Sequence, residues 1–195
     1  MWSAAILAGG QARRFGGRDK GALVVDGRSI LDRQLAELTT LTEDVMIVGG
    51  PAAAPPRARR VADRVPGHGP LGGLHAALSE GTGDATIVIA CDMPYVSAAL
   101  LGHLLALTRE ADAVVPRTAR GYHPLCAAYT RACLAPAAAR LADGRLTMSD
   151  LFEDVRVRVV TAEEIDIFGN HDRLLANVNT PAEYGGLEAF QGHQL

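Results

Sequence analysis

Short apolar runs alternate with longer stretches in which apolar residues recur at helical spacing, and this order holds along most of the chain. The expected strands are Ala4–Leu7, Val45–Val48, a short run around Arg60–Ala62, Thr86–Ala90, Ala113–Pro116, Leu125–Tyr129 and Val155–Val160. The expected helices are Ser29–Leu41, which Ser29 would cap, Leu71–Leu78, Ala98–Leu107, Arg131–Leu141 and Pro181–Phe190. Strands separated by helices predict a three-layer α/β/α sandwich around a mostly parallel, Rossmann-like sheet.

Chemically distinctive residues follow the expected strands directly. A glycine-rich loop follows the first strand, Gly49 follows the second, Asp63 the third, and Asp92 the run Thr86–Ala90. Ligands of open parallel sheets bind outside the carboxyl ends of the strands. The sequence therefore predicts a ligand site along one edge of the sheet.

The loop that ends the first strand has the composition of a phosphate-binding loop. Gly9 and Gly10 let the backbone approach a ligand closely, and Arg14 and Lys20 are donors that suit phosphate oxygens. The loop lacks the Gly-Lys-Ser/Thr ending of a P-loop. Glycines and basic residues alone fit a solvated turn equally well, so composition leaves both interpretations open.

Composition excludes several classes of function. The 195 residues predict a single domain over positions 1–195, and a formal net charge of −3 offers no general basic surface for nucleic acid or an anionic membrane. No apolar run approaches the ~20 residues of a membrane-spanning helix, and no signal-peptide pattern is present. Cys91, Cys126 and Cys133 show no Cys-x-x-Cys pairing, which predicts reduced, mostly buried thiols in a cytoplasmic protein.

Two aspartates are candidates for direct contact with a ligand. Asp92, in Asp92-Met93-Pro94, comes directly after a buried strand, where a carboxylate can hold Mg²⁺ or can bond the next backbone amides of a turn. Asp63 follows the third expected strand and can accept hydrogen bonds from a ligand there or form a solvated ion pair with a neighbouring arginine. The residues alone leave both choices open.

Several motifs together resemble one enzyme family. The string Leu-Ala-Gly-Gly-x3-Arg-x-Gly-x3-Lys at positions 7–20 resembles the signature of nucleotidyltransferases, in particular the molybdenum cofactor guanylyltransferase family (MobA type). Gly-Pro-Leu-x-Gly from Gly69, the Asp-x-Pro at Asp92, and Asn-x-Asn-Thr-Pro from Asn177 also resemble motifs of that family. The resemblance runs from Ala4 to about Tyr184 and implies a nucleotide-diphospho-sugar transferase-like fold.

The resemblance implies a role for each matched residue. Lys20, Arg14 and Asp92 would be catalytic, Asp92 would hold Mg²⁺, and Asp63 would read guanine. The implied nucleotide-binding residues are Leu7, Ala8, Gly9, Gly10, Lys20, Gly49, Asp63, Gly69, Pro70, Leu71 and Asp92. His123, Asn177 and Asn179 would lie on the acceptor or phosphate side, although His123 fits equally well as a histidine bonded to nearby backbone.

Two positions depart from the family pattern. Gly49 stands where the family often has a base-contacting asparagine, so that contact is lost or is made through backbone. A later basic pair is reduced to Arg145, which removes support for a second-substrate contact there.

The implied reaction is the transfer of GMP from Mg-GTP to the terminal phosphate of molybdopterin, with release of pyrophosphate. Transient contacts with molybdenum-insertion proteins and with recipient molybdoenzymes or their chaperones would follow. Three other functions remain open: cytidylyl transfer to the same pterin, guanylyl transfer to a cobalamin precursor, and non-catalytic carriage of GTP or the pterin.

Overall fold

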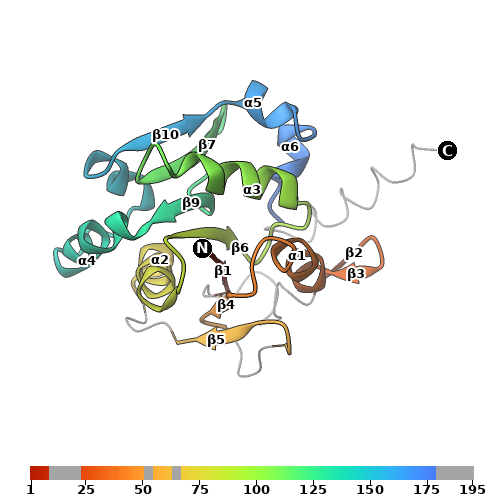
Figure 1. Cartoon of the computed structure of the whole chain (residues 1–195), viewed down its shortest axis with the longest axis horizontal. Helices are drawn as coiled ribbons and strands as arrows, with labels where there is room; N and C mark the ends of the chain where they lie inside the picture. Colours follow the sequence, from red (N-terminus) through yellow and green to blue (C-terminus); the bar gives the residue numbers. More distant parts are fainter. Residues whose placement is uncertain (9–22, 51–54, 63–66, 179–195) are drawn as a thin grey trace.

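The computed structural model describes residues 1–8, 23–50, 55–62 and 67–178, and an eight-stranded sheet runs through them. Its strands follow the order β10-β7-β9-β6-β1-β4-β5, with β8 paired to β7. Figure 1 shows β10 and β5 at opposite ends of the sheet. The strands are β1 (Trp2–Leu7), β4 (Val45–Val48), β5 (Arg59–Val61), β6 (Ala85–Ala90), β7 (Ala113–Thr118), β8 (Gly121–Tyr122), β9 (Cys126–Thr130) and β10 (Val157–Val160).

Parallel pairing dominates the sheet. β4, β1 and β6 are parallel neighbours, as are β4 and β5, and β10 and β7. β9 runs antiparallel to both β6 and β7. A separate ribbon of β2 (Val24–Val25) and β3 (Arg28–Ser29) precedes the first helix. The predicted mostly parallel sheet is therefore confirmed, with β9 as its reversed interior strand.

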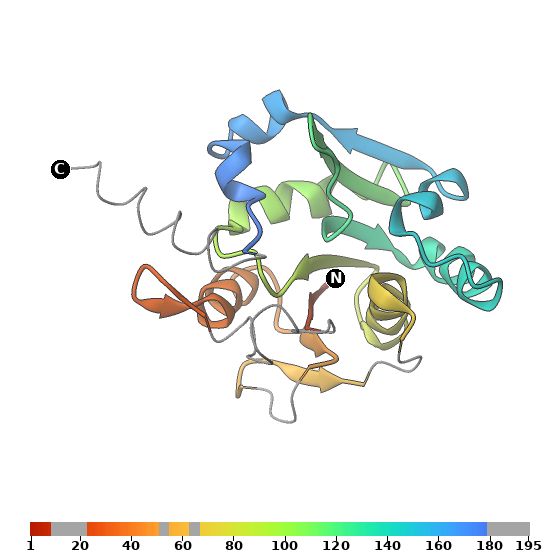
Figure 2. The same cartoon turned by 180° about the vertical axis from the view of Figure 1, so that it is seen from behind.

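Helices cover both faces of the sheet (Figures 1 and 2). One core packs against α1 (Ile30–Leu38), α3 (Ala98–Leu107), α5 (Ala162–Asp166) and α6 (His171–Leu174). The other packs against α2 (Gly69–Glu80), α4 (Leu134–Ala142) and the 3₁₀ helices η3 (Arg131–Cys133) and η4 (Met148–Glu153). This is the predicted three-layer α/β/α sandwich.

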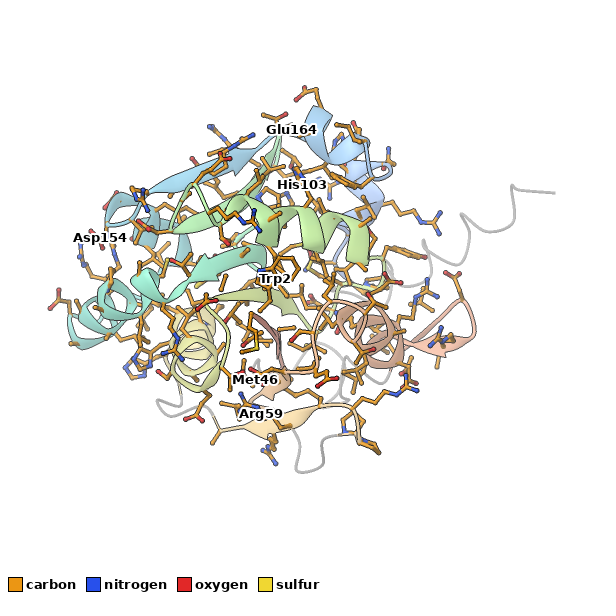
Figure 3. The ribbon with its side chains drawn as sticks, in the orientation of Figure 1. Trp2, Met46, Arg59, His103, Asp154 and Glu164 are labelled. Atoms are coloured by element: carbon orange, nitrogen blue, oxygen red, sulfur yellow. The ribbon has the colours of Figure 1, made fainter. Side chains whose placement is uncertain are left out.

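β1 shows how one strand serves both cores. Ala4 and Ile6 belong to the core on the α1 side, and Ala5 and Leu7 to the core on the α2 side. Because successive side chains of a strand point to opposite faces, a strand covered on both faces is largely apolar, and the polar Ser3 of β1 is fully buried as well. Met46 of β4 is likewise fully buried, whereas Arg59 of the edge strand β5 is exposed (Figure 3).

The predicted elements agree with the structure to within a few residues. Val45–Val48 and Ala98–Leu107 have the predicted bounds, and Ser29 caps α1 by accepting a hydrogen bond from the Asp32 N–H at 3.0 Å. Pro181–Phe190 lies outside the described residues. The prediction of a single domain over 1–195 stays a prediction.

One predicted helix is interrupted. Arg131–Leu141 was expected to be continuous, but η3 ends at Cys133 and α4 starts at Leu134. Pro136 lies in the first turn of α4, where a missing N–H is tolerated, while its ring clashes with the carbonyl that a continuous helix would place four residues earlier. No helix within the described residues is long and apolar enough to cross a membrane.

Candidate active site

The parallel strands β1, β4 and β6 end at one edge of the sheet, and β1 lies between the other two. After β1, the chain first adds β4 on one side of β1 and later adds β6 on its other side. Such a reversal of strand order opens a crevice at the carboxyl ends of the strands, where α/β proteins bind their ligands. Leu7 ends β1, Gly49 follows β4, and Asp92 comes two residues after β6.

Backbone contacts draw these three strand ends together. The Ala8 N–H donates to the Val48 carbonyl at 2.9 Å, and the Cys91 N–H donates to the Leu7 carbonyl at 3.2 Å. Gly50 has a φ of +75°, and a Cβ added there would lie 2.8 Å from the Cβ of Ala8. Only glycine lets the loop after β4 approach Ala8 this closely.

The Gly-Pro-Leu-x-Gly motif opens α2 against the end of β1. Gly69 is the first residue of the helix, with Pro70 in its first turn, and Leu71 is fully buried. A Cβ added at Gly73 would lie 3.1 Å from Leu7 Cδ1. The motif therefore brings the N-terminus of α2 to the same edge as Leu7 and Ala8.

Gly49 takes up a backbone conformation that glycine favours, with φ of +74°. Its N–H donates to the Val61 carbonyl at 3.0 Å, which ties the end of β4 to β5. That N–H is therefore already used within the fold. Its carbonyl is the backbone group at this position that could replace the family's asparagine side chain.

Asp92 is held in place by hydrogen bonds from residues near the end of the described chain. Only 9% of its surface is exposed, and its Oδ1 accepts a hydrogen bond from Asn177 Nδ2 at 2.8 Å. Its backbone carbonyl accepts from the Val178 N–H at 2.9 Å. Asn177 therefore contacts Asp92 directly, while its placement on the acceptor or phosphate side stays a prediction.

The donor set around Asp92 suits a cation that brings most of its own ligands. Within the described residues, no three His, Cys, Asp or Glu side chains gather as a metal-binding group. Mg²⁺ commonly takes one or two carboxylates and completes its shell with water and substrate phosphates. A single, largely buried carboxylate at the carboxyl ends of the strands fits this coordination by Mg²⁺, whereas zinc would require several protein ligands.

Gln34 is a site residue that the sequence analysis missed. It lies on α1, is fully buried, and donates from Nε2 to the carbonyls of Ala90 at 2.7 Å and Met93 at 3.0 Å. These carbonyls flank Cys91 and Asp92. The spacing of Ile30, Gln34 and Leu38 would have revealed it, because it puts a polar residue in the apolar stripe of a helix.

His123 lies between β8 and β9, close to the end of β6. The Leu125 carbonyl, two residues on, accepts from the Ala90 N–H at 2.9 Å. His123 Nε2 lies 2.9 Å from the hydroxyl of Thr118, and its backbone N–H donates to the Pro116 carbonyl at 2.9 Å. Burial, with smaller contributions from the charges of Arg120 and His171, lowers the pKa of His123 and so favours the neutral ring.

The thiols of β9 and η3 are poor nucleophiles. Burial raises the pKa of Cys126 and of Cys133 to about 12, and the Cys133 thiol donates to the Asp112 carbonyl. Because the thiolate is the reactive form, both cysteines are inert at neutral pH. The remaining predicted site residues, Gly9, Gly10, Arg14, Lys20, Asp63 and Asn179, lie outside the described residues.

Comparison with known proteins identifies the family. The family model described as "MobA-like NTP transferase domain" matches residues 4–161. The molybdenum cofactor guanylyltransferase of Desulfosudis oleivorans is 31% identical over 190 residues, covering 94% of this chain and 93% of the relative. A probable molybdenum cofactor guanylyltransferase of Chloroflexus aggregans is 34% identical over 200 residues, covering 98% of this chain and 96% of the relative.

Solved structures agree on the fold. The molybdopterin-guanine dinucleotide biosynthesis protein A of Archaeoglobus fulgidus superposes with a TM-score of 0.83 at 24% identity, covering 98% of this chain and 99% of that one. The 2-C-methyl-D-erythritol 4-phosphate cytidylyltransferase of Thermus thermophilus superposes with a TM-score of 0.69 at 16% identity, covering 96% and 98%. With the family model spanning most of the sheet, this chain belongs to the MobA-like NTP transferase family and is a nucleotidyltransferase.

Proposed function

We propose that this enzyme transfers GMP from Mg-GTP to the terminal phosphate of molybdopterin and releases pyrophosphate. Relatives 31% and 34% identical over more than nine tenths of this chain carry the name molybdenum cofactor guanylyltransferase. The structural observation that carries the proposal is the partly buried Asp92–Asn177 hydrogen bond beside the joined ends of β1 and β6. This pair provides an oriented carboxylate at the edge where a nucleotide would bind.

The reaction needs no nucleophile from the protein, because the acceptor phosphate is itself an anion. One of its oxygens attacks the α-phosphorus of GTP in line, and pyrophosphate departs. Asp92 would hold Mg²⁺, which would neutralise phosphate charge as it develops on the leaving group. Arg14, Lys20 and the backbone of Gly9 and Gly10 would donate hydrogen bonds to the phosphates. The buried thiols are not required.

The base would be selected by Asp63 and by backbone. Guanine presents N1–H and N2–H₂ side by side, and one carboxylate can accept both. Leu7, Ala8 and the opening of α2 at Gly69 would enclose the nucleotide. Because Gly49 carries no side chain, discrimination between bases would depend more heavily on Asp63 than where an asparagine assists.

The acceptor would lie beside Asp92, with Asn177 and His123 on the acceptor side. A neutral His123 can donate or accept a hydrogen bond without adding charge. The finished dinucleotide must then leave for an enzyme that uses it. We therefore expect transient contacts with molybdenum-insertion proteins and with recipient enzymes or their chaperones.

Release of pyrophosphate from GTP, CTP and ATP in the presence of molybdopterin tests the proposal, with mass spectrometry of the product. We expect turnover with GTP and a product mass equal to the pterin plus GMP. Turnover with CTP in preference to GTP would identify a cytidylyltransferase. Turnover with a cobalamin precursor in place of the pterin would change the acceptor. Tight GTP binding without pyrophosphate release would indicate a carrier.

A further inference from the structure

Helix α1 is attached to the loop that carries Asp92 through hydrogen bonds from two consecutive residues. Gln34 Nε2 donates to the Ala90 carbonyl at 2.7 Å and to the Met93 carbonyl at 3.0 Å. Arg33 Nε donates to the Pro94 carbonyl at 3.0 Å. These bonds fix the backbone on both sides of Asp92 across a separation of 56 to 61 positions in the sequence.

The orientation of the Gln34 amide is determined by its neighbours. The two atoms that Nε2 contacts are both carbonyl oxygens, which only accept hydrogen bonds. Turning the amide over would place its oxygen against both of them. The NH₂ group therefore faces the Asp92 loop.

The oxygen of the Gln34 amide, in contrast, makes no hydrogen bond with the described residues. Gln34 is fully buried, and its Oε1 has no hydrogen-bond partner among the described residues. A buried acceptor without a partner destabilises the fold, and apolar residues fill the neighbouring core positions of α1. The presence of an amide at this core position is therefore better explained by its hydrogen bonds to the loop than by packing.

We propose that Gln34 is a positioning residue that holds the Asp92 carboxylate in the orientation required for the divalent cation. Asn177 fixes one oxygen of that carboxylate, and Gln34 fixes the backbone beneath it. The inference rests on the proposed role of Asp92 as a metal ligand. Groups that orient a metal ligand without touching the metal commonly change metal affinity or activity by about 10–100-fold when removed.

Binding of Mn²⁺, followed by electron paramagnetic resonance in the presence of the α,β-methylene analogue of GTP, tests this role. Gln34→Met keeps the length of the side chain and removes both donors. We expect it to weaken Mn²⁺ binding about 10-fold or more. Affinity for the analogue in EDTA should stay within about twofold of the wild-type value, because the bonds of Gln34 are to the metal loop. Leu35→Met, one position along α1, is the matched control and should bind Mn²⁺ as the wild type does.

Hydrogen exchange in the metal-free protein provides a second readout. The amides of residues 91–93 should exchange faster in Gln34→Met and not in Leu35→Met. If Gln34→Met does not fold, Gln34→Asn carries the same test, because its shorter side chain cannot reach both carbonyls.

The outcomes separate this inference from the proposed function. Wild-type Mn²⁺ affinity in Gln34→Met, with weakened affinity in Asp92→Asn, would overturn the role of Gln34 and leave the metal site intact. Wild-type affinity in Asp92→Asn would overturn both. Weakened binding in Gln34→Met and Leu35→Met alike would show that only the packing of α1 matters, and would also overturn it.

Discussion

Individual residues at the carboxyl ends of β1, β4 and β6 differ in how many of their hydrogen-bonding groups are already bonded within the protein. Asn177 gives its amide to Asp92, and Nε2 of His123 lies against the Thr118 hydroxyl. The N–H of Gly49 is taken by Val61. Within the described part of the chain, Nδ1 of His123 and the Gly49 carbonyl make no such bond, so these groups would be open to a substrate.

Removing the charge of Asp92 should stop the reaction while keeping the fold. In Asp92→Asn the side chain keeps an oxygen that can accept from Asn177, but it no longer balances a divalent cation. We expect pyrophosphate release to fall by roughly 100-fold or more, by comparison with the loss of one charge-stabilising group. Asp143→Asn, at an exposed position after α4, is the control and should retain full activity. Unchanged Mg²⁺-dependent turnover in Asp92→Asn would remove Asp92 from the site.

The choice of base should depend on Asp63. ATP lacks the paired donors of guanine and would leave the carboxylate unsatisfied, at a cost of ~1–3 kcal/mol. A tenfold change corresponds to 1.4 kcal/mol, so the preference for GTP over ATP should be about 10-fold to 100-fold. We expect Asp63→Ala to flatten this preference in kcat/KM. If the GTP preference survives, the base is read by other groups, such as the backbone at Gly49 or Gly69.

At the scale of elements, the site depends on how closely the loops after β1 and β4 approach. Gly50→Ala places a methyl group against Ala8 and also forces alanine into a positive φ. Gly144→Ala has the same conformational problem, with φ of +71° and nothing within 4 Å. The difference between the two variants in the free energy of unfolding therefore measures the effect of the contact with Ala8.

We expect Gly144→Ala to lower the free energy of unfolding by about 1 kcal/mol through the strained conformation alone. Gly50→Ala should lose a further 1–3 kcal/mol, roughly the cost of overpacking, and should also raise the KM for GTP. Urea denaturation and steady-state kinetics measure both effects. Equal losses in the two variants, with an unchanged KM, would show that the Ala8 contact is not important for the site.

The long elements of this fold could be predicted from the sequence and the shortest ones could not. Val45–Val48 and Ala98–Leu107 are apolar runs with clear ends, so their bounds are correct. The β2–β3 ribbon and β8 have strands of two residues, too short to show any alternation. Asp92 was found because it follows a strand, whereas Gln34 was missed because its partners are backbone carbonyls far along the chain.

At the scale of the whole molecule, the edge opposite the site has its own anchoring residue. Asp44, at the start of β4, accepts hydrogen bonds from Ser3 at 2.7 Å, Arg59 at 2.9 Å and Thr82 at 2.9 Å. Burial alone would raise the pKa of Asp44, but these hydrogen bonds outweigh it and lower the pKa from 3.8 to about 2. One carboxylate thus joins β1, β5 and the loop before β6.

The lowered pKa of Asp44 predicts the direction in which the stability of the fold changes with pH. Asp44 stabilises the fold above pH 3.8, and this contribution is lost as the pH falls toward 2. Asp44→Asn should lower the free energy of unfolding by about 1–2 kcal/mol at pH 7, and the difference from wild type should shrink below pH 3.8 and disappear as the pH falls through about 2. Asp84→Asn removes an exposed ion pair with the N-terminus and should change stability little. A constant difference between Asp44→Asn and wild type from pH 7 to pH 2 would contradict this account.

The central place of β1 has a consequence for synthesis on the ribosome. β1 leaves the ribosome before the other strands of the sheet, and its neighbour β6 is made much later. The contact of Met1 with Asp84, next to this pair of strands, joins residues 83 positions apart in the sequence. At roughly 5–20 residues per second, this strand waits on the order of ten seconds for its partner. Throughout that interval a largely apolar strand, with Ser3 as its polar exception, has an unpaired edge, the kind of segment that chaperones bind. Nascent chains arrested before β6 should therefore be captured by a chaperone, and chains arrested well after it should not.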